Sequence, residues 1–253
     1  MDIHGFLTTH QLPSSYAETA QKWFTPLCEQ LLKHQEGATK PFIVGINGSQ
    51  GSGKSTLTSF IEYYLSSVHG KQVVSLSIDD FYFDQSQRNA LAIKVHPLLA
   101  TRGVPGTHNI PLALDTLRNL DSGSRTLLPR FDKATDNPFP TEQWPVIASS
   151  PDFIILEGWC VGATPQSQSE LKPPINHLEE VEDPLGIWRS FVNTELAGDY
   201  QTLFAKIDYR IMLKAPSFDC VYQWRLEQEH KLAKKAWSER ERYKTNMISL
   251  STA

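Results

Sequence analysis

The stretch of residues 41–68 limits the fold of this chain more than any other part of its sequence. It begins with a short apolar run, Pro41-Phe42-Ile43-Val44-Gly45-Ile46-Asn47, which predicts a buried strand. A glycine-rich turn follows, and residues 55–68 then carry apolar side chains at helical spacing until Gly70. Another apolar run, at 72–78, predicts a second strand. Because strand, helix and strand in this order build parallel sheets, we expect an α/β fold.

The glycine-rich turn adds a second constraint, because Gly48-Ser49-Gln50-Gly51-Ser52-Gly53-Lys54-Ser55 matches the P-loop pattern at every fixed position. Glycines allow successive backbone N–H groups to point at one phosphate, and the following helix adds its positive N-terminal end. Lys54 would then reach the β- and γ-phosphates, and the Ser55 hydroxyl would bind Mg²⁺. We therefore expect a three-layer fold of the P-loop NTPase type, with helices flanking a mainly parallel sheet. The cofactors would be ATP and Mg²⁺, and ATP would be bound by residues 48–55 and Thr56.

Acidic residues follow two further strands of the expected sheet. The second strand runs into Asp79 and Asp80, and an apolar run at 152–156 predicts a third strand that ends at Glu157. Ligands of open α/β sheets sit beyond the carboxyl ends of the strands, so these acids should lie beside the P-loop. Asp79 is our candidate for the base that accepts the proton of an alcohol, while Glu157 and, through water, Asp80 are candidates for holding Mg²⁺. The alternative interpretation is a pair of turn-forming aspartates and an acid that caps a strand.

Composition narrows the setting of this site. The net charge is -4, so the chain lacks the basic surplus that nucleic-acid-binding proteins carry. No apolar run reaches the roughly 18 residues needed to cross a bilayer, and the first residues lack a basic segment followed by an apolar one. Cys28, Cys160 and Cys220 are too far apart to suggest a zinc site or a disulfide framework. We expect a cytoplasmic protein with no nucleic-acid or membrane partner.

The remaining sequence surrounds this core. Residues 14–35 predict an amphipathic helix with Trp23 and three leucines on its apolar face. Residues 84–150 are rich in proline and glycine, which predicts functional loops with one helix near 111–120. Beyond the third strand we expect a surface loop, two helices, a strand and a charged helix, at 163–180, 183–197, 199–206, 209–213 and 217–243. We interpret residues 1–253 as one domain with an N-terminal helical extension at 1–40 and a substrate-binding insertion at 84–150.

Four further stretches become informative when they are taken together with the P-loop. They are Ser77-Ile78-Asp79-Asp80-Phe81-Tyr82, Arg102-Gly103-Val104-Pro105-Gly106-Thr107-His108-Asn109, Leu128-Pro129-Arg130-Phe131-Asp132-Lys133 and Leu156-Glu157-Gly158-Trp159. In their order and amino-acid sequence these stretches resemble the D-glycerate 3-kinase family. That family belongs to the P-loop kinases that include uridine kinase, pantothenate kinase and phosphoribulokinase. The resemblance implies transfer of the γ-phosphoryl group of ATP to the 3-hydroxyl of D-glycerate, with Asp79 at the position of the catalytic base.

The resemblance also implies a lid. Trp224-Arg225-Leu226-Glu227-Gln228-Glu229 is similar to the family's lid segment, in which an arginine approaches the transferring phosphate. Arg225 therefore joins Lys54 and Asp79 as a catalytic candidate.

The acceptor itself suggests further candidates. Glycerate is a small carboxylate, and arginine holds a carboxylate through two parallel hydrogen bonds. Arg102 and Arg130 are therefore candidates for binding the substrate, with His108 and Lys133 nearby in the same stretches. We count Thr107, which precedes the histidine, with them.

Two alternatives to a glycerate kinase stay open on the sequence. One is a kinase for another small alcohol, such as pantothenate, a nucleoside or a sugar phosphate. The other is an ATP-binding protein without activity, because family members usually continue with another helix and a final strand, whereas this chain stops at Met247-Ile248-Ser249-Leu250-Ser251-Thr252-Ala253. We therefore expect a C-terminal truncation. A GTPase or an ABC-type ATPase is disfavoured, since N-K-x-D and L-S-G-G-Q are both absent from the sequence.

Overall fold

The computed structural model describes residues 2–217, 219–224 and 226. The strands in this part of the chain are β1 (Phe42–Gly48), β2 (Val73–Ser77), β3 (Thr126–Leu127), β4 (Phe131–Asp132), β5 (Asn137–Pro138), β6 (Val146–Ile147), β7 (Phe153–Gly158) and β8 (Tyr209–Leu213). Its α-helices are α1 (Ile3–Thr9), α2 (Tyr16–Thr19), α3 (Thr25–Gln35), α4 (Lys54–His69), α5 (Gln85–Lys94), α6 (Ile110–Asp121), α7 (Gln168–Leu171), α8 (His177–Glu182), α9 (Ile187–Ala197) and α10 (Asp199–Phe204). Shorter helical turns of other types are η1 (Ala20–Phe24), η2 (Ile78–Phe81), η3 (Pro97–Ala100) and η4 (Thr141–Gln143).

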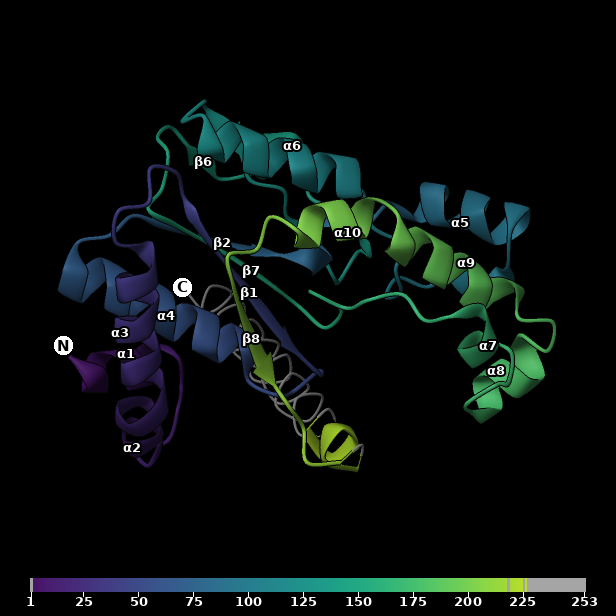
Figure 1. Cartoon of the computed structure of the whole chain (residues 1–253), viewed down its shortest axis with the longest axis horizontal. Helices are drawn as coiled ribbons and strands as arrows, with labels where there is room; N and C mark the ends of the chain where they lie inside the picture. The colour runs from purple at the N-terminus through teal and green to yellow at the C-terminus, as the bar shows by residue number, and fades with distance from the viewer. Residues whose placement is uncertain (1, 218, 225, 227–253) are drawn as a thin grey trace, which may run out of the picture.

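Four strands form the central sheet, in the order β2-β7-β1-β8, and every neighbouring pair in it is parallel. Helix α4 connects β1 to β2, as the sequence predicts, and β8 has its predicted bounds. The short strands outside this sheet form two antiparallel pairs, β3 with β6 and β4 with β5. Helices lie on both sides of the central sheet (Figure 1), which confirms the predicted α/β fold with a parallel sheet between helical layers.

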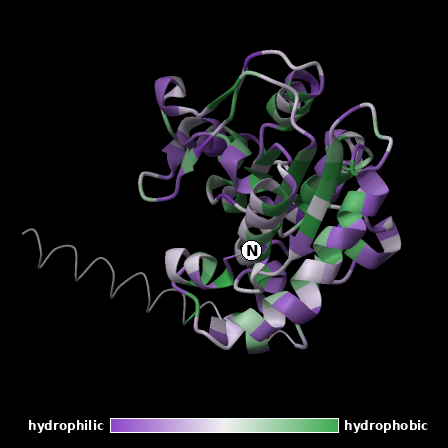
Figure 2. Cartoon of the chain, turned by 90° about the vertical axis from the view of Figure 1, so that its left-hand side faces the viewer, coloured by the Kyte–Doolittle hydropathy of each residue, from purple (hydrophilic) through white to green (hydrophobic). Residues whose placement is uncertain are grey.

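Side chains along β7 alternate between two hydrophobic cores. Phe153 and Ile155 pack into the core beneath α3 and α4, whereas Ile154 and Leu156 pack into the core beneath α6 and α10. A strand that is buried on both faces appears in the sequence as a continuous apolar run, which is why this strand could be predicted. Figure 2 shows these apolar strands in the interior, with hydrophilic residues concentrated on the outer helices.

The predicted N-terminal helix is present but interrupted. It comprises α2, η1 and α3, and η1 is a π-helical turn. A π-turn holds more residues than an α-turn and therefore rotates the side chains that it carries. The predicted place of Trp23 on the apolar face is consequently wrong, since its side chain is 63% exposed, whereas Leu31 is fully buried as expected. Helix α1, which the sequence pattern did not predict, adds Phe6 and Leu7 to the core beneath α3 and α4.

The region at 84–150 holds more regular structure than predicted. The expected helix is α6, but α5 precedes it and was missed, because its sequence is polar and its buried residue is the charged Arg88. The loop predicted at 163–180 contains α7 and the start of α8, and the helix predicted from residue 183 begins later, in α9. Residues 219–224 are helical, and the rest of the long helix predicted at 217–243 lies outside the described residues, apart from residue 226. No helix within the described ranges is long and apolar enough to cross a bilayer.

Candidate functional site

The carboxyl ends of β1, β2 and β7 lie together at one edge of the sheet. Glu157 of β7 is in register with Ser77 of β2 and with Ile46 of β1. Strand β1 runs directly into the P-loop, and β2 runs into η2, a 3-10 turn that carries Asp79 and Asp80. Parallel pairing therefore brings together the three segments that the sequence predicted for one site.

The P-loop depends on its glycines for its shape. Gly51 and Gly53 have φ angles of 80° and 92°, in the left-handed region that side chains other than glycine rarely adopt. Gly53 immediately precedes the 16-residue helix α4, so the unpaired N–H groups of the first helical turn are part of the loop. A Cβ atom on Gly48 would lie 2.5 Å from the Ser52 hydroxyl oxygen and 3.0 Å from the Leu213 Cβ, so a side chain at this position would displace its neighbours. The loop therefore presents backbone donors at close range, as phosphate binding requires.

Lys54 lies over this loop. Its Nζ donates to the Ser49 carbonyl at 3.1 Å. Burial lowers the pKa of Lys54, and the nearby carboxylates of Glu157 and Asp79 oppose that shift. In the described part of the chain, the buried hydroxyls of Ser49 and Ser52 have no hydrogen-bond partner. Because burying an unpaired hydroxyl is unfavourable, these two groups suit a polar ligand such as a phosphate.

Ser55 and Glu157 are two of the predicted magnesium ligands, and they belong to the segments in which the neighbouring parallel strands β1 and β7 end. Ser55 is exposed in the first turn of α4, next to the half-buried Thr56. Burial raises the pKa of the Glu157 carboxyl, and the Lys54 ammonium opposes this shift. No cluster of three or more His, Cys, Asp or Glu side chains that could hold a metal occurs within the described residues. A hydroxyl and a carboxylate fit Mg²⁺, which takes hard oxygen ligands and completes its shell with water and phosphate oxygens.

Asp79 lies between the P-loop lysine and the insertion. Lys133 Nζ donates to its Oδ2 at 2.7 Å, and the Asp79 side chain is 28% exposed. Burial together with the Asp79 charge raises the pKa of Tyr82, whose hydroxyl donates to the Gly103 carbonyl at 3.5 Å. Asp79 is therefore a partly accessible carboxylate that is paired with Lys133 of the insertion. Its charge also acts on the Lys54 ammonium and raises the pKa of that group.

Asp80 faces different partners from its neighbour. Its Oδ1 accepts the backbone N–H of Phe131 at 3.1 Å, and its Oδ2 accepts from the Arg130 guanidinium at 3.3 Å. Burial raises the Asp80 pKa, and Arg130 opposes the shift. Asp80 thus fastens strand β4 of the insertion to η2, and it occupies the guanidinium of Arg130, one of the predicted substrate residues.

Arg102 belongs to an ion-pair cluster that the sequence did not predict. Its guanidinium pairs with Asp136, which also pairs with Arg88. Arg88 is completely buried and donates to several backbone carbonyls as well. Both guanidiniums lie over the ring of Phe131, at 5.6 Å for Arg102 and 5.9 Å for Arg88. Two guanidiniums share one carboxylate, so the cluster carries excess positive charge, and the 30% exposed Arg102 is its accessible member.

Thr107 and His108 lie deeper than the other predicted substrate residues. The Thr107 hydroxyl donates to the Val104 carbonyl at 2.7 Å and accepts the Gly103 N–H at 3.3 Å, so it closes a turn within its own loop. The buried His108 ring stacks on Tyr82 with 4.2 Å between ring centroids. Burial lowers the pKa of His108 to about 3. The imidazole is therefore neutral near pH 7 and adds no positive charge to the site.

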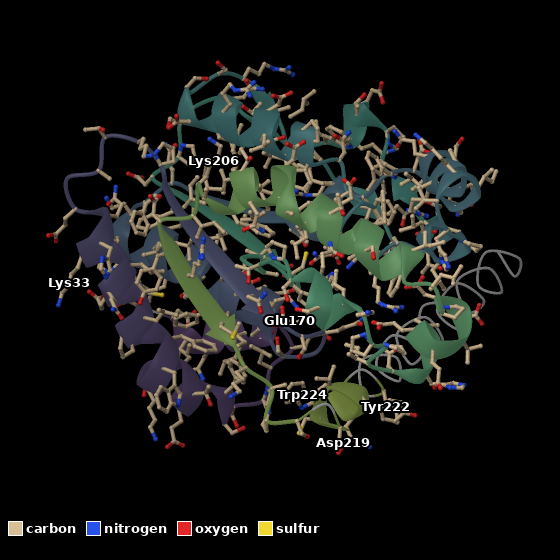
Figure 3. All side chains as sticks on the ribbon, turned by 45° about the vertical axis from the view of Figure 1, so that its right-hand side comes forward. Lys33, Glu170, Lys206, Asp219, Tyr222 and Trp224 are labelled. Carbon is tan, nitrogen blue, oxygen red and sulfur yellow. The ribbon has the colours of Figure 1, made fainter. Side chains whose placement is uncertain are left out.

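The predicted lid segment begins where the described residues end. Arg225 lies outside them. Trp224 contacts the P-loop, since a Cβ atom on Gly51 would lie 2.5 Å from the Trp224 Cβ. Figure 3 labels Trp224, Tyr222 and Asp219, which belong to the short helical segment that follows β8. The site combines a P-loop with the carboxylate of Glu157 at a neighbouring strand end and the accessible carboxylate of Asp79. This combination is typical of a P-loop kinase.

Comparison with known proteins agrees with this class. Residues 43–164 match the phosphoribulokinase / uridine kinase family. The chain is 35% identical over 221 residues to the "uncharacterized kinase mug58" of Schizosaccharomyces pombe, which covers 81% of this chain and 78% of that protein. It is 28% identical over 199 residues to the chloroplastic D-glycerate 3-kinase of Arabidopsis thaliana, covering 75% of this chain but 41% of the plant protein.

A solved structure gives the same result. The D-glycerate 3-kinase from Cryptococcus neoformans var. grubii aligns with a TM-score of 0.72 and 27% identity, over 86% of this chain and 80% of that one. The chain belongs to the phosphoribulokinase / uridine kinase family and is a kinase.

Proposed function

We propose that this kinase transfers the γ-phosphoryl group of ATP to the 3-hydroxyl of D-glycerate, giving 3-phosphoglycerate and ADP. Two D-glycerate 3-kinases resemble the chain, one in sequence and one in structure. The observation that carries the proposal is the position of Asp79, an accessible carboxylate at the P-loop edge with the insertion's Lys133 2.7 Å away.

Asp79 is the proposed general base. It accepts the proton of the acceptor hydroxyl while the hydroxyl oxygen bonds to the γ-phosphorus and the bond from that phosphorus to the bridging oxygen of ADP breaks. Lys133 orients the carboxylate through its 2.7 Å hydrogen bond. Lys54 stabilises the charge that develops on the transferring group, and we assign the same task to Arg225 by resemblance.

Arg102 is the proposed binding residue for the acceptor carboxylate. Arg88 and Arg102 have one shared carboxylate partner, Asp136, so a second carboxylate would neutralise the remaining positive charge. Arginine suits this task because its planar fork matches a carboxylate. Arg130 is already bonded to Asp80, and Thr107 to its own loop. We therefore place Arg102 first among the predicted substrate residues, with Arg130 and Thr107 in supporting positions.

On the nucleotide side of the site, we propose that the P-loop residues 48–56 bind ATP. Ser55 and Glu157 hold Mg²⁺, which supplies charge neutralisation to the phosphates when it is bound. Asp80 is left out of this ligand set, since both of its carboxylate oxygens are engaged by the insertion. We further propose a cytoplasmic protein with one kinase domain, in which residues 1–40 extend the helical layer and residues 84–150 form the acceptor-binding insertion.

A coupled ADP-release assay with four acceptors tests the proposal. D-glycerate, L-glycerate, pantothenate and uridine would each be supplied with Mg·ATP, and the product would be identified by phosphorus NMR. We expect turnover with D-glycerate and a phosphate on its 3-oxygen. Turnover of another acceptor without turnover of D-glycerate would contradict the substrate. Tight ATP binding in calorimetry without turnover of any acceptor would favour the inactive ATP-binding protein.

A further inference from the structure

A buried hydrogen-bonded pair lies next to the candidate base. The His108 Nδ1 atom and the Tyr200 hydroxyl oxygen are 2.6 Å apart, although the residues are 92 positions apart in the sequence. Both side chains are buried, with Tyr200 coming from α10. The His108 ring stacks on Tyr82, and the Asp79 charge acts on both of these side chains. This pair therefore connects α10 to the acceptor side of the site.

The surroundings of Tyr200 determine where its single proton points. The hydroxyl oxygen accepts the backbone N–H of Gly106 at 3.0 Å. Burial raises the Tyr200 pKa, so the hydroxyl keeps its proton. His108 Nδ1 is the hydrogen-bond acceptor that the described residues offer to this proton. The Tyr200 O–H therefore donates to Nδ1, and the neutral imidazole carries its own proton on Nε2.

The Nε2–H group of His108 has no acceptor in the described part of the chain, although the atom is buried. Leaving a buried donor unpaired costs about 1–3 kcal/mol. A ligand atom that accepts this bond would remove that cost. Because burial lowers the His108 pKa to about 3, the donor is neutral throughout the physiological range. His108 thus offers a neutral donor of fixed tautomer, and its ring lies within the electrostatic influence of Asp79.

We propose that His108 Nε2–H binds a non-reacting oxygen of the acceptor substrate, and that Tyr200 is a positioning residue that fixes the tautomer and orientation of His108. This inference rests on the proposed function, because it requires an oxygen-rich acceptor beside Asp79. A small hydroxy acid meets that requirement, since it carries a carboxylate and hydroxyls on neighbouring carbons.

A neutral donor suits this position for an electrostatic reason. A protonated imidazole would add a positive charge near Asp79, which would lower the pKa of that carboxyl and weaken it as a base. A neutral N–H group binds an oxygen without adding charge beside the base. An acceptor without an oxygen at this position would leave His108 Nε2–H unpaired. The pair of His108 and Tyr200 therefore also discriminates against such acceptors.

Substitutions that keep or remove the Nε2 donor test the inference. The amide nitrogen of glutamine takes the place of Nε2 and that of asparagine the place of Nδ1, while phenylalanine keeps the ring and removes both. We expect His108→Gln to stay within about threefold of the wild-type acceptor KM, and His108→Phe and His108→Asn to raise it about tenfold or more. The KM for ATP should not change in any of them.

Tyr200→Phe tests the positioning role with little change of shape. It should raise the acceptor KM about tenfold. Nitrogen-15 NMR of the histidine ring should show the proton on Nε2 in the wild type and a mixture of tautomers in the variant. Tyr64→Phe is the matched control, because it removes a similar hydroxyl bond, to Glu29 at 2.5 Å, in the other core. That control should leave the acceptor KM and the histidine spectrum unchanged.

A role in packing alone predicts the opposite ranking. Phenylalanine would then retain a lower acceptor KM than glutamine, because it preserves the stacking on Tyr82. That ranking, or a wild-type spectrum with the proton on Nδ1, overturns the inference while turnover of D-glycerate upholds the proposed function. If the wild type phosphorylates a different hydroxy acid, the proposed substrate fails, and the same ranking measured with that acceptor decides the inference. Absence of turnover with every acceptor overturns both. Where a substitution of His108 prevents folding, Tyr200→Phe decides the outcome.

Discussion

The nucleotide side and the acceptor side of this site are held together by contacts of very different range. On the nucleotide side, Lys54 bonds to Ser49, five residues away, and the loop shape comes from its own glycines. On the acceptor side, Arg88 reaches Asp136 over 48 positions, and His108 reaches Tyr200 over 92. Phosphate binding is thus a local property of the backbone, whereas acceptor binding exists only once distant segments have folded together. Substitutions on the two sides should differ accordingly.

The largest effect should come from Lys54→Ala. Loss of this charge removes stabilisation of the transferring phosphoryl group, so we expect kcat to fall about a thousandfold, equivalent to ~4 kcal/mol. Stability should change little, because the loop is shaped by its backbone. Steady-state kinetics and thermal unfolding check the two expectations. Lys71→Ala is the control, since Lys71 pairs with Asp152 outside the site. A kcat near the wild-type value would refute the P-loop as the reaction site.

Asp79→Asn should have the next largest effect. The variant keeps the shape of the side chain but loses the proton acceptor, so kcat should fall about a hundredfold. ATP affinity, measured by calorimetry, should stay within about twofold of the wild type, because the P-loop is untouched. Asp80→Asn serves as the comparison and should act mainly through the attachment of the insertion. A greater loss of kcat in a fully folded Asp80→Asn protein would reverse the assignment of the base.

Asp136→Asn should act on stability. The change leaves the completely buried Arg88 without its carboxylate, which should lower the free energy of unfolding by about 3 kcal/mol. Chemical denaturation measures this. Asp115→Asn is the matched control, because Asp115 forms an exposed pair with Arg118, and its loss should change stability by less than about 0.5 kcal/mol. Equal effects of the two variants would show that the cluster does not hold the insertion together.

The smallest effect should come from Arg102→Lys. Lysine keeps the charge but lacks the planar fork, so the acceptor KM should rise about tenfold while the KM for ATP stays constant. Kinetics with each substrate varied in turn check the separation. A rise in the KM for ATP alone would move Arg102 to the nucleotide side and remove the difference between the two sides.

Local patterns were sufficient for the nucleotide side and for most of the sheet. The strands β1, β2, β7 and β8 could be predicted because each is a short segment in which apolar residues predominate. The P-loop could be predicted because all of its phosphate-binding residues lie within eight consecutive positions of the sequence. The presence of Asp79 and Glu157 at the same edge followed from the rule that parallel strands end together.

The acceptor side could not be predicted to the same depth. Arg88 gave no signal, since a single arginine in a polar helix is usually on the surface. The φ angle of 58° at Asp136 marks a tight turn, and the following Asn137-Pro138 could have indicated one, but not its ion pairs. Tyr200 gave no signal either, because its partner His108 lies 92 positions away in the sequence. The exposure of Trp23 was missed because no sequence pattern indicates a π-turn.

The contact between Gly51 and Trp224 has a consequence for how this sequence can change over time. Residue 51 is a variable position of the P-loop pattern, yet here a Cβ atom would meet Trp224, and the φ angle of 80° disfavours a side chain as well. Divergence at residue 51 should therefore be tolerated only when residue 224 becomes glycine or its backbone moves away, and when the turn relaxes as well. A library that varies both positions would reveal this dependence as pairs of substitutions that succeed together and fail alone.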